Sequence, residues 1–508
     1  MYRSTRGNPE KLSAAEAIKT GIAVDGGLFV PNVMPQVDEK WLVNLVNLEY
    51  PERALEVLRL FLPDYSVEEL RDCINTAYTG DKFDDAAIAP IITIDNNTHI
   101  LELWHGPTSA FKDMALQILP QLMSKALSKT KEKSEIVILT ATSGDTGKAA
   151  LEGFANVEQI KIIVFYPDEG VSSIQRIQMI TQPGKNVSVV AVRGNFDDTQ
   201  TGVKKIFNDV SFNKELAEKG LQLSSANSIN WGRLAPQIVY YFSAYADLVG
   251  KGQLELGKPI NFVVPTGNFG NLLAGYYAKL MGLPIGKLIC ASNSNNVLTD
   301  FLHQGIYNRV RTFHKTLSPS MDILISSNLE RLLYHITGGD TTQIKSWMEE
   351  LTLTGQYRIG DNDLENIKNT FWADWVDDKE TVKEIKRIFK KYQYVADPHT
   401  AVAWQVGERY CQQTGDKTPL VIVSTASPFK FNESVLAAIT DPKSVVGRNE
   451  FSMLHELSQV SSWPVPLALA ALEEAPVCHH ILCDKEDMPM VVKQILKNES
   501  NCPTNKPT

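Results

Sequence analysis

The chain has few cysteines and no long apolar run. Six cysteines are scattered over 508 residues, at Cys73, Cys290, Cys411, Cys478, Cys483 and Cys502. This spacing is typical of a reduced enzyme and not of a disulfide-stapled domain. No apolar stretch approaches the roughly 20 residues that a membrane helix requires. The first residues contain Arg3 and Arg6 and lack the apolar core of a signal peptide, so we expect a cytoplasmic protein with no membrane partner.

A surplus of positive charge is also missing. The chain has 50 basic and 59 acidic residues and a net charge of −9. Because nucleic acids and anionic membranes bind through clustered positive charge, this balance argues against both as partners. Cys478, His479, His480 and Cys483 lie close together, but no second ligand pair follows nearby in sequence. We therefore predict ordinary packing there and no metal site.

The order of hydrophobic patterns predicts an α/β protein with a mainly helical N-terminal domain. Residues 1–93 place apolar side chains at helical spacing, and Ser13 with Glu16 forms a capping-box pattern. Asp95-Asn96-Asn97 separates two apolar runs and predicts a hairpin. From about residue 134, helices alternate with short apolar strands of the kind that parallel sheets bury between helices. These strands are expected at 136–139, 161–165, 187–192, 262–264, 287–290 and 420–423.

The most informative motif is a single lysine that follows a Gly-Pro turn. After Gly106-Pro107, Lys112 opens a helical run over 114–123, with Thr108 or Ser109 as candidate caps. The positive end of a helix dipole and partly apolar neighbours both disfavour an ammonium. They lower a lysine pKa towards values at which the free amine can react with a carbonyl group. Lys112 is therefore a candidate catalytic residue, and a solvated first-turn lysine is the alternative.

Two later strands end in residues suited to binding the rest of a cofactor. The strand that precedes Gly267 runs into a turn over 267–271, and a helix follows at once. Glycines let backbone N–H groups converge there, and the helix N-terminus adds partial positive charge, as in a phosphate cradle. No GKS or GKT follows, which excludes a nucleotide P-loop. The strand at 420–423 leads to Thr425, whose hydroxyl could hydrogen-bond a pyridine nitrogen. With Lys112 these segments could hold pyridoxal phosphate, although each alone is also an ordinary turn.

A third turn and a helix start carry candidate substrate contacts. The segment 142–147 (Thr-Ser-Gly-Asp-Thr-Gly) follows a strand and precedes a helix, so its N–H groups and the Ser143 and Thr146 hydroxyls can bind a carboxylate. Asn230 and Arg233 flank a turn glycine and can chelate a phosphate, Arg233 through its planar fork. An N-capped helix and a structural arginine in an ion pair are the alternatives.

Two more side chains have open roles. His399 follows Asp397-Pro398 and either orients a substrate or is a satisfied histidine beside a capping aspartate. Lys148 begins the helix after the 142–147 turn. It either lies harmlessly on that helix surface or adds charge at the anion site.

Taken in order, four motifs resemble those of threonine synthases, which are fold-type-II pyridoxal-phosphate enzymes. They read H-G-P-T-x-A-F-K-D, T-S-G-D-T-G, P-T-G-N-F-G-N and S-T-A-S-P, and both ends of the chain are similar to that family as well. The resemblance implies a fold like the tryptophan synthase β subunit, with two open, mostly parallel α/β units. It implies an N-terminal domain at 1–93, a larger unit at 94–133 and 236–450, a smaller unit at 134–235, and a C-terminal extension at 451–508.

The resemblance also implies the ligands and the residues that bind them. Pyridoxal 5'-phosphate is the expected cofactor, bound by Lys112, Gly267, Asn268, Phe269, Gly270, Asn271 and Thr425. The expected substrate is O-phospho-L-homoserine, bound by Ser143, Asp145, Thr146, Asn230 and Arg233. The 142–147 turn would hold its α-carboxylate. Ser427 replaces the histidine of the T-A-H-P form found in several members, so no role is carried over to it.

The implied reaction eliminates phosphate from the γ carbon and adds water at Cβ to give L-threonine, with Lys112 removing the α proton. Two alternatives stay open. One is a phospholyase that releases phosphate and ammonia from O-phosphohomoserine or O-phosphothreonine. The other is a non-catalytic protein of the same fold, although the presence of Lys112, Asn268 and Thr425 argues against it. We expect a monomer or a homodimer.

Overall fold

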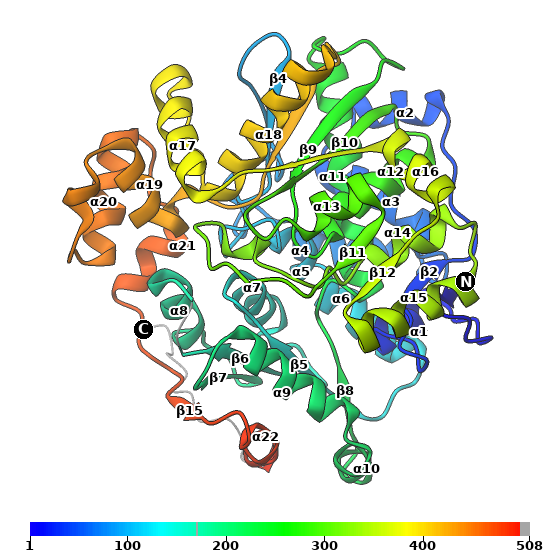
Figure 1. Ribbon diagram of the computed structural model, residues 1–508. Coiled ribbons are helices and arrows are strands. Elements are labelled where there is room, and N and C mark those ends of the chain that lie inside the picture. Colours follow the sequence, from blue (N-terminus) through cyan, green and yellow to red (C-terminus); the bar gives the residue numbers. More distant parts are fainter. Residues whose placement is uncertain (169–170, 498–508) are drawn as a thin grey trace.

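The computed structural model describes residues 1–168 and 171–497 and contains two parallel sheets at different levels of the molecule (Figure 1). Residues 169–170 and 498–508 lie outside the described part, which places Cys502 and the end of the predicted C-terminal extension outside it too. The α/β prediction with mostly parallel sheets is confirmed.

The larger sheet has six strands in the order β13-β10-β9-β14-β4-β3. All neighbouring pairs are parallel except β3 with β4, which form the hairpin predicted at Asp95-Asn96-Asn97. The strands are β3 (Ile91–Thr93), β4 (Thr98–Glu102), β9 (Ile260–Pro265), β10 (Ile285–Ser292), β13 (Phe371–Trp375) and β14 (Leu420–Ser424). β9 and β14 are buried along their whole length, as expected for strands covered by helices on both faces.

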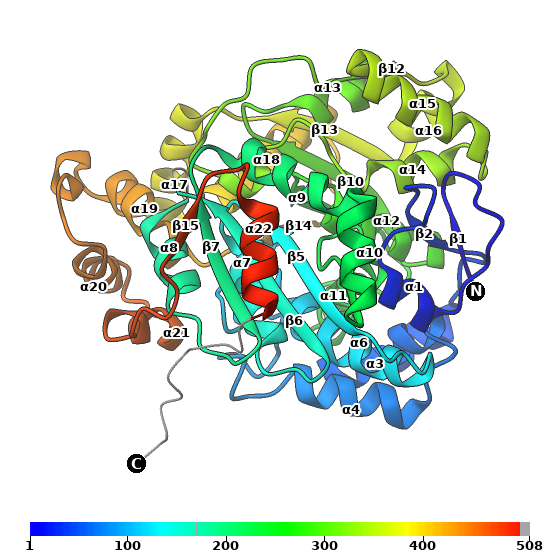
Figure 2. The ribbon, with the colours of Figure 1, turned by 90° about the horizontal axis from the view of Figure 1, so that it is seen from below.

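The smaller sheet has five parallel strands in the order β15-β7-β6-β5-β8. They are β5 (Glu135–Ala141), β6 (Ile160–Pro167), β7 (Val187–Val192), β8 (Leu221–Ser224) and β15 (Ile481–Cys483). The helices of this unit are α7 (Asp145–Phe154), α8 (Ser173–Ile180), α9 (Phe196–Asn208) and α10 (Val210–Glu218). β15 comes from the predicted C-terminal extension, and α22 (Met488–Lys497) packs beside α9 over the same sheet (Figure 2). The domain division remains a prediction, but this extension completes the smaller sheet.

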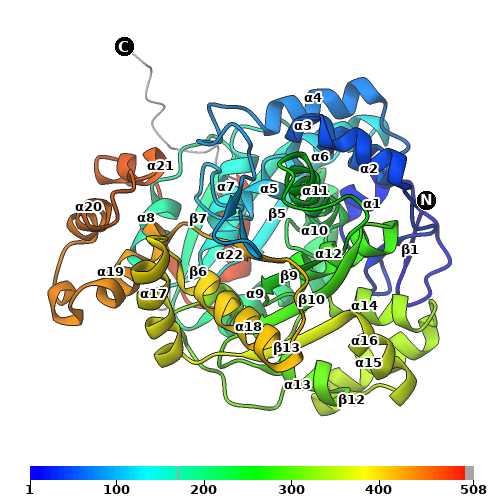
Figure 3. The same cartoon turned by 90° about the horizontal axis from the view of Figure 1, so that it is seen from above.

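The N-terminal region is mainly helical. It comprises β1 (Tyr2–Ser4), α1 (Ala14–Thr20), β2 (Phe29–Pro31), α2 (Glu39–Val46), α3 (Tyr50–Phe61) and α4 (Val67–Ala77). The capping box at the start of α1 is confirmed, because Ser13 N donates to Glu16 Oε2 at 2.8 Å and Glu16 N donates to Ser13 Oγ at 3.2 Å. α2 and α3 pack on the long buried helix α11 (Trp231–Gly250), and α4 packs on α6 (Leu119–Lys129) (Figure 3).

Further helices cover the larger sheet and extend from it. α12 (Gly270–Met281) and α18 (Pro398–Thr414) pack against its strands. Between β10 and α18 lie α13 (Val297–Gln304), β11 (Ile306–Asn308), η1 (Pro319–Met321), α14 (Leu329–Ile336), α15 (Thr341–Thr354), β12 (Gln356–Arg358), α16 (Asp361–Thr370) and α17 (Asp378–Tyr392). After β14 come η2 (Pro428–Phe431), α19 (Asn432–Ile439), η3 (Pro442–Val445), α20 (Glu450–Ser461), α21 (Leu467–Ala470) and η4 (Ala471–Glu473). None of the helices described here is long and apolar enough to span a membrane.

The helical run predicted over 114–123 is broken into two helices. α5 (Asp113–Leu116) ends after one turn, and α6 begins at Leu119 with Pro120 in its first turn. Proline has no N–H and its ring clashes with the preceding turn, so Pro120 suits the first turn of a new helix and disfavours continuation of α5.

Candidate functional site

The candidate lysine lies at the start of α5 and is buried. Lys112 is 8% exposed, and its Nζ lies 4.7 Å from the centre of the Phe111 ring. Lys112 Nζ donates to Ser320 Oγ at 3.3 Å and lies 3.5 Å from Asp145 Oδ2. Burial lowers the pKa of Lys112 to about 8, although Asp145 opposes that shift. A lysine with a lowered pKa has a larger share of free amine near neutral pH than an ordinary lysine, as a nucleophile requires.

The turn before Lys112 is held differently from what the sequence suggested. Thr108 does not cap α5; its N–H and Oγ1 donate to the Asp113 carboxylate at 2.8 and 2.7 Å. Ser109 adopts a left-handed φ of 56°, a strained conformation that is common at functional turns. The strand-end segment of Thr425 meets this turn directly, because Phe111 N donates to Thr425 O at 2.8 Å. Two of the predicted motifs are thereby joined through the backbone.

The turn over 267–271 has the form of an anion cradle. Phe269 has a left-handed φ of 63°, and α12 starts at Gly270, so the unpaired N–H groups of its first turn converge on one point. Asn271 is 6% exposed, and its Oδ1 accepts from the hydroxyls of Tyr240 and Tyr241 at 2.7 and 2.8 Å. Its Nδ2 is buried with no hydrogen-bond partner in the described part of the chain. A buried donor without a partner is costly, which fits a missing phosphate oxygen.

Gly267 and the loop over 318–322 bring the cradle close to Lys112. A Cβ on Gly267 would lie 2.6 Å from Ser320 O, so only glycine fits against this loop. Ser320 then reaches Lys112 with its hydroxyl, and its N–H donates to His399 Nε2 at 3.2 Å. His399 Nδ1 lies 2.7 Å from Asp397 Oδ1, and Asp397 caps α18. The structure therefore gives His399 the role of a satisfied histidine that holds Ser320.

The 142–147 turn forms the start of α7 in the smaller unit and faces Lys112. Thr142 Oγ1 accepts from the N–H groups of Gly144 and Gly147 at 3.0 and 2.8 Å, which fixes the turn. Ser143 and Thr146 are partly exposed, whereas Asp145 is 3% exposed. Burial alone would raise the pKa of Asp145, but nearby lysine ammoniums hold it well below its usual range. Asp145 is thus a buried carboxylate turned towards Lys112.

Arg233 is a buried arginine, and not all of its N–H donors form hydrogen bonds within the described residues. It is 3% exposed on α11; its Nη1 donates to Ala226 O at 2.7 Å, and its Nε has no partner among the described residues. Burial lowers the pKa of Arg233 to about 10. Asn230 has a structural place: its Oδ1 caps α11 through Gly232 N at 2.9 Å, and its Nδ2 donates to Ile18 O at 2.9 Å. A substrate contact by Asn230 remains a prediction.

Several other side chains differ from expectation. Lys148 is not on a helix surface: it is buried and pairs with Glu152 at 3.0 Å, while its Nζ also donates to Gln182. Asn268 is exposed, and its Oδ1 accepts from Ser327 Oγ at 3.3 Å. Sequence reasoning missed two residues of the site, Lys430 and Ser320, because neither lies in a recognisable sequence motif. Lys430 Nζ lies 2.7 Å from Asp145 Oδ1.

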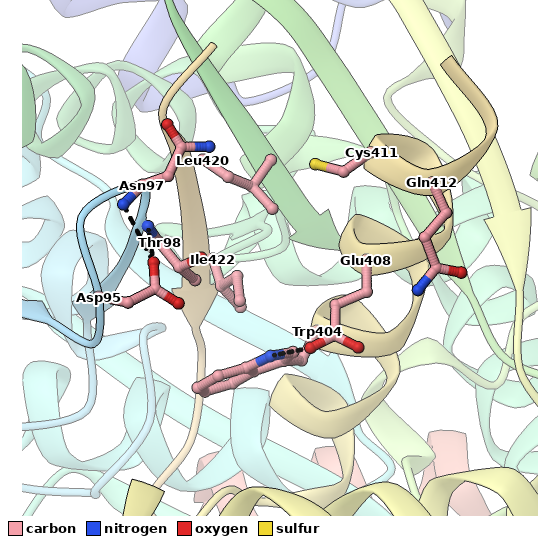
Figure 4. Close-up of a pocket in the computed structure, with 9 residues that line it drawn as sticks. All are labelled: Asp95, Asn97, Thr98, Trp404, Glu408, Cys411, Gln412, Leu420 and Ile422. Atoms are coloured by element: carbon pink, nitrogen blue, oxygen red, sulfur yellow. Dashed lines mark hydrogen bonds between the residues drawn. The ribbon is translucent and has the colours of Figure 1, made fainter. Parts of the chain in front are cut away.

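A separate cavity of about 290 Å³ lies at the other ends of the strands (Figure 4). Its walls come from the start of β4, the start of β14 and one side of α18, where Trp404 Nε1 donates to Glu408 Oε1 at 3.1 Å. In open parallel sheets, ligands bind beyond the carboxyl ends of the strands. Lys112, Thr425 and the cradle lie at those ends, so this cavity is not the candidate active site.

Comparison with known families shows which family the chain belongs to. The family described as "Pyridoxal-phosphate dependent enzyme" matches residues 94–426, "Threonine synthase N terminus" matches 1–78, and "Threonine synthase, C-terminal" matches 400–477. The chain belongs to the threonine synthase family. This membership confirms the predicted family, fold type, enzyme class and pyridoxal phosphate cofactor.

Individual relatives of the threonine synthase family cover most of the chain. Threonine synthase of Saccharomyces cerevisiae is 39% identical over 87% of this chain and 89% of its own length. Human threonine synthase-like 1 is 40% identical over 96% of this chain, but the chain spans only 67% of that protein. Among solved structures, the pyridoxal-phosphate-bound threonine synthase of Brucella melitensis has a TM-score of 0.86, with 35% identity and 99% coverage of both chains.

Proposed function

We propose that the protein catalyses the conversion of O-phospho-L-homoserine and water to L-threonine and inorganic phosphate. The observation that carries the proposal is a buried lysine, Lys112, beside a phosphate cradle with a buried unpaired donor on Asn271. Family membership and the threonine synthases of yeast and Brucella melitensis support the substrate class.

The cradle and the strand end suit pyridoxal phosphate. The N–H groups over 267–271 and Asn271 Nδ2 would bind its phosphate, and the Thr425 hydroxyl would hydrogen-bond its ring nitrogen. When bound, this cofactor supplies an electron sink for the charge left at Cα after proton loss. Lys112 would bind the cofactor through its amine and, once released, take the α proton, since its pKa of about 8 suits both steps.

Substrate recognition would use two anion sites, one at the first turn of α7 and one at Arg233 of α11. The first turn of α7, with Ser143 and Thr146, offers N–H and hydroxyl donors to the α-carboxylate. Arg233 offers its unpaired Nε and remaining N–H groups to the substrate phosphate. Holding both ends of the substrate would fix the reacting carbons between Lys112 and the cofactor, and such positioning lowers the barrier to reaction. We also propose that the protein acts in the cytoplasm as a monomer or homodimer.

The products formed from O-phosphohomoserine test this proposal. Loaded enzyme should release phosphate and threonine in equal amounts. Release of 2-oxobutyrate and ammonia in place of threonine would assign the protein to the phospholyases, and absence of phosphate release would assign it a non-catalytic role. The Lys112→Ala variant serves as the control, because it should release no phosphate under the same conditions.

A further inference from the structure

A second buried lysine, Lys430, shares the Asp145 carboxylate with Lys112. Its side chain is fully buried in η2, directly after the strand-end motif, and its Nζ donates to Thr108 O at 2.9 Å. It also forms an ion pair with Asp145 Oδ1 at 2.7 Å. A lysine is almost never fully buried unless a charged partner offsets the free-energy cost of removing its ammonium from water.

The two oxygens of Asp145 are used unequally. Oδ1 accepts from Lys430 Nζ at 2.7 Å and from Gln175 Nε2 at 2.8 Å. Oδ2 accepts from Ser320 Oγ at 3.1 Å and lies 3.5 Å from Lys112 Nζ. The short ion pair is therefore made with Lys430, and the contact with Lys112 is long. Gln175 keeps the carboxylate in this orientation, since it packs where a side chain on Gly144 would otherwise lie.

We propose that Lys430 is a positioning residue that draws Asp145 away from Lys112 and so lets the Lys112 amine lose its proton. The inference rests on the proposed function, in which Lys112 binds the cofactor. Lys430 acts in two ways, by holding the carboxylate that would stabilise a Lys112 ammonium and by placing a positive charge beside that ammonium.

The charged groups around Lys112 are consistent with these two effects of Lys430. Burial is the largest cause that lowers the pKa of Lys112; Asp145 raises it, and Lys430 and Arg233 lower it. Asp113, on α5, is the other carboxyl group nearby, and burial raises its pKa to about 6 while Thr108 binds both of its oxygens. His399 reaches the backbone of Ser320 and does not contact the lysine.

The chemistry requires an unprotonated amine. When Lys112 binds the cofactor, its nitrogen bonds to the aldehyde carbon, and the carbonyl oxygen leaves as water. An ammonium has no lone pair for this step, so it must first release a proton to solvent. A Lys112 held tightly by Asp145 would release that proton only at higher pH.

The test measures how fast cofactor-free full-length protein binds pyridoxal phosphate as a function of pH, followed by visible absorbance. In Lys430→Met the midpoint of this profile should rise by about one unit or more, because Asp145 is left to Lys112 alone. Lys430→Arg should return the midpoint close to that of the wild type. Asp145→Asn should lower the midpoint, since both lysines then lack their counter-ion.

Two further variants keep the test decisive. If Lys430→Met does not fold, Asp145→Asn is compared with the double variant Asp145→Asn/Lys430→Met, in which no carboxylate is left unpaired. Since both proteins lack Asp145, this comparison isolates the second effect of Lys430, its positive charge beside the Lys112 ammonium. A higher midpoint in the double variant supports that effect, and an equal or lower one overturns it. Lys148→Met is the matched control, because it removes a buried lysine of α7 that pairs with Glu152, and it should leave the midpoint unchanged.

The Lys112→Ala variant distinguishes failure of the proposed function from failure of the role assigned to Lys430. Lys112→Ala should not bind the cofactor covalently at any pH. If it still does, the proposed function has the wrong lysine. If Lys112 is correct but Lys430→Met folds and keeps the wild-type midpoint, the role assigned to Lys430 is wrong.

Discussion

Replacing Arg233 by lysine should damage substrate use while leaving the cofactor in place. Arg233 is 3% exposed, and within the described part of the chain its guanidinium donates only through Nη1, to Ala226 O at 2.7 Å. Its unpaired Nε and remaining N–H groups can form a planar fork on a phosphate, which one ammonium cannot reproduce. The loss of a charge-assisted bond costs about 1.5–3 kcal/mol. This free energy corresponds to a roughly ten- to hundredfold fall in kcat/KM for O-phosphohomoserine.

Steady-state kinetics and phosphate inhibition measure this effect. Inorganic phosphate should inhibit the wild type competitively and the Arg233→Lys variant more weakly by a similar factor. Arg53→Lys is the matched control: Arg53 is also buried, but it pairs with Asp247 at 2.6 Å between α3 and α11, so its loss should lower Tm without changing KM. Wild-type kcat/KM together with wild-type phosphate inhibition in Arg233→Lys would refute the assignment of the substrate phosphate to this arginine.

Three further predictions concern the cradle and the lysine turn. Asn271→Ala should weaken pyridoxal phosphate binding roughly ten- to hundredfold in an absorbance titration. Asn268→Ala should weaken binding less, because the Asn268 side chain is exposed. Equal affinity in the wild type and both variants would mean that the cofactor phosphate binds elsewhere. Gly267→Ala should lower cofactor affinity, since its Cβ would lie 2.6 Å from Ser320 O, and unchanged affinity would contradict that close approach. Burial alone would lower the pKa of His105, but Asp84 and Glu102 raise it to about 9. Its stabilising effect is at most about 3–4 kcal/mol. It is complete below the unfolded value near pH 6.5 and is lost as pH rises through 9, so Tm should fall over that window and His105→Asn should flatten the fall.

The strands and the turns that bear the candidate site residues could be predicted from the sequence because their signals are local. Buried parallel strands are short apolar runs, and β5, β6, β7, β9, β10 and β14 all occur where such runs were found. The Ser13 capping box and the hairpin before β4 are equally local. Lys112 and the cradle were identified because a Gly-Pro turn and closely spaced glycines require particular backbone shapes.

The features that could not be predicted from the sequence depend on contacts between segments that are distant along the chain. Nothing in the run around Lys430 shows that its side chain turns inward to meet Asp145, which is 285 residues earlier in the chain. Ser320 lies in the three-residue helix η1, which is too short to give a periodic pattern, and the fold brings it to Lys112. The β15 strand is three residues long, so pairing with β7 and not its own pattern defines it. Asn230 caps α11, and because a helix cap and an anion site use the same residue types, the sequence alone could not indicate the cap.

The most direct test of this account is to find which lysine carries the cofactor. The purified protein loaded with pyridoxal phosphate is reduced with borohydride, digested and mapped by mass spectrometry. The account predicts one modified peptide, with the label on Lys112, and no labelled peptide from Lys112→Ala. A label on Lys430, on Lys148 or on any other lysine, with Lys112 unmodified, would contradict the site and the chemistry proposed for it.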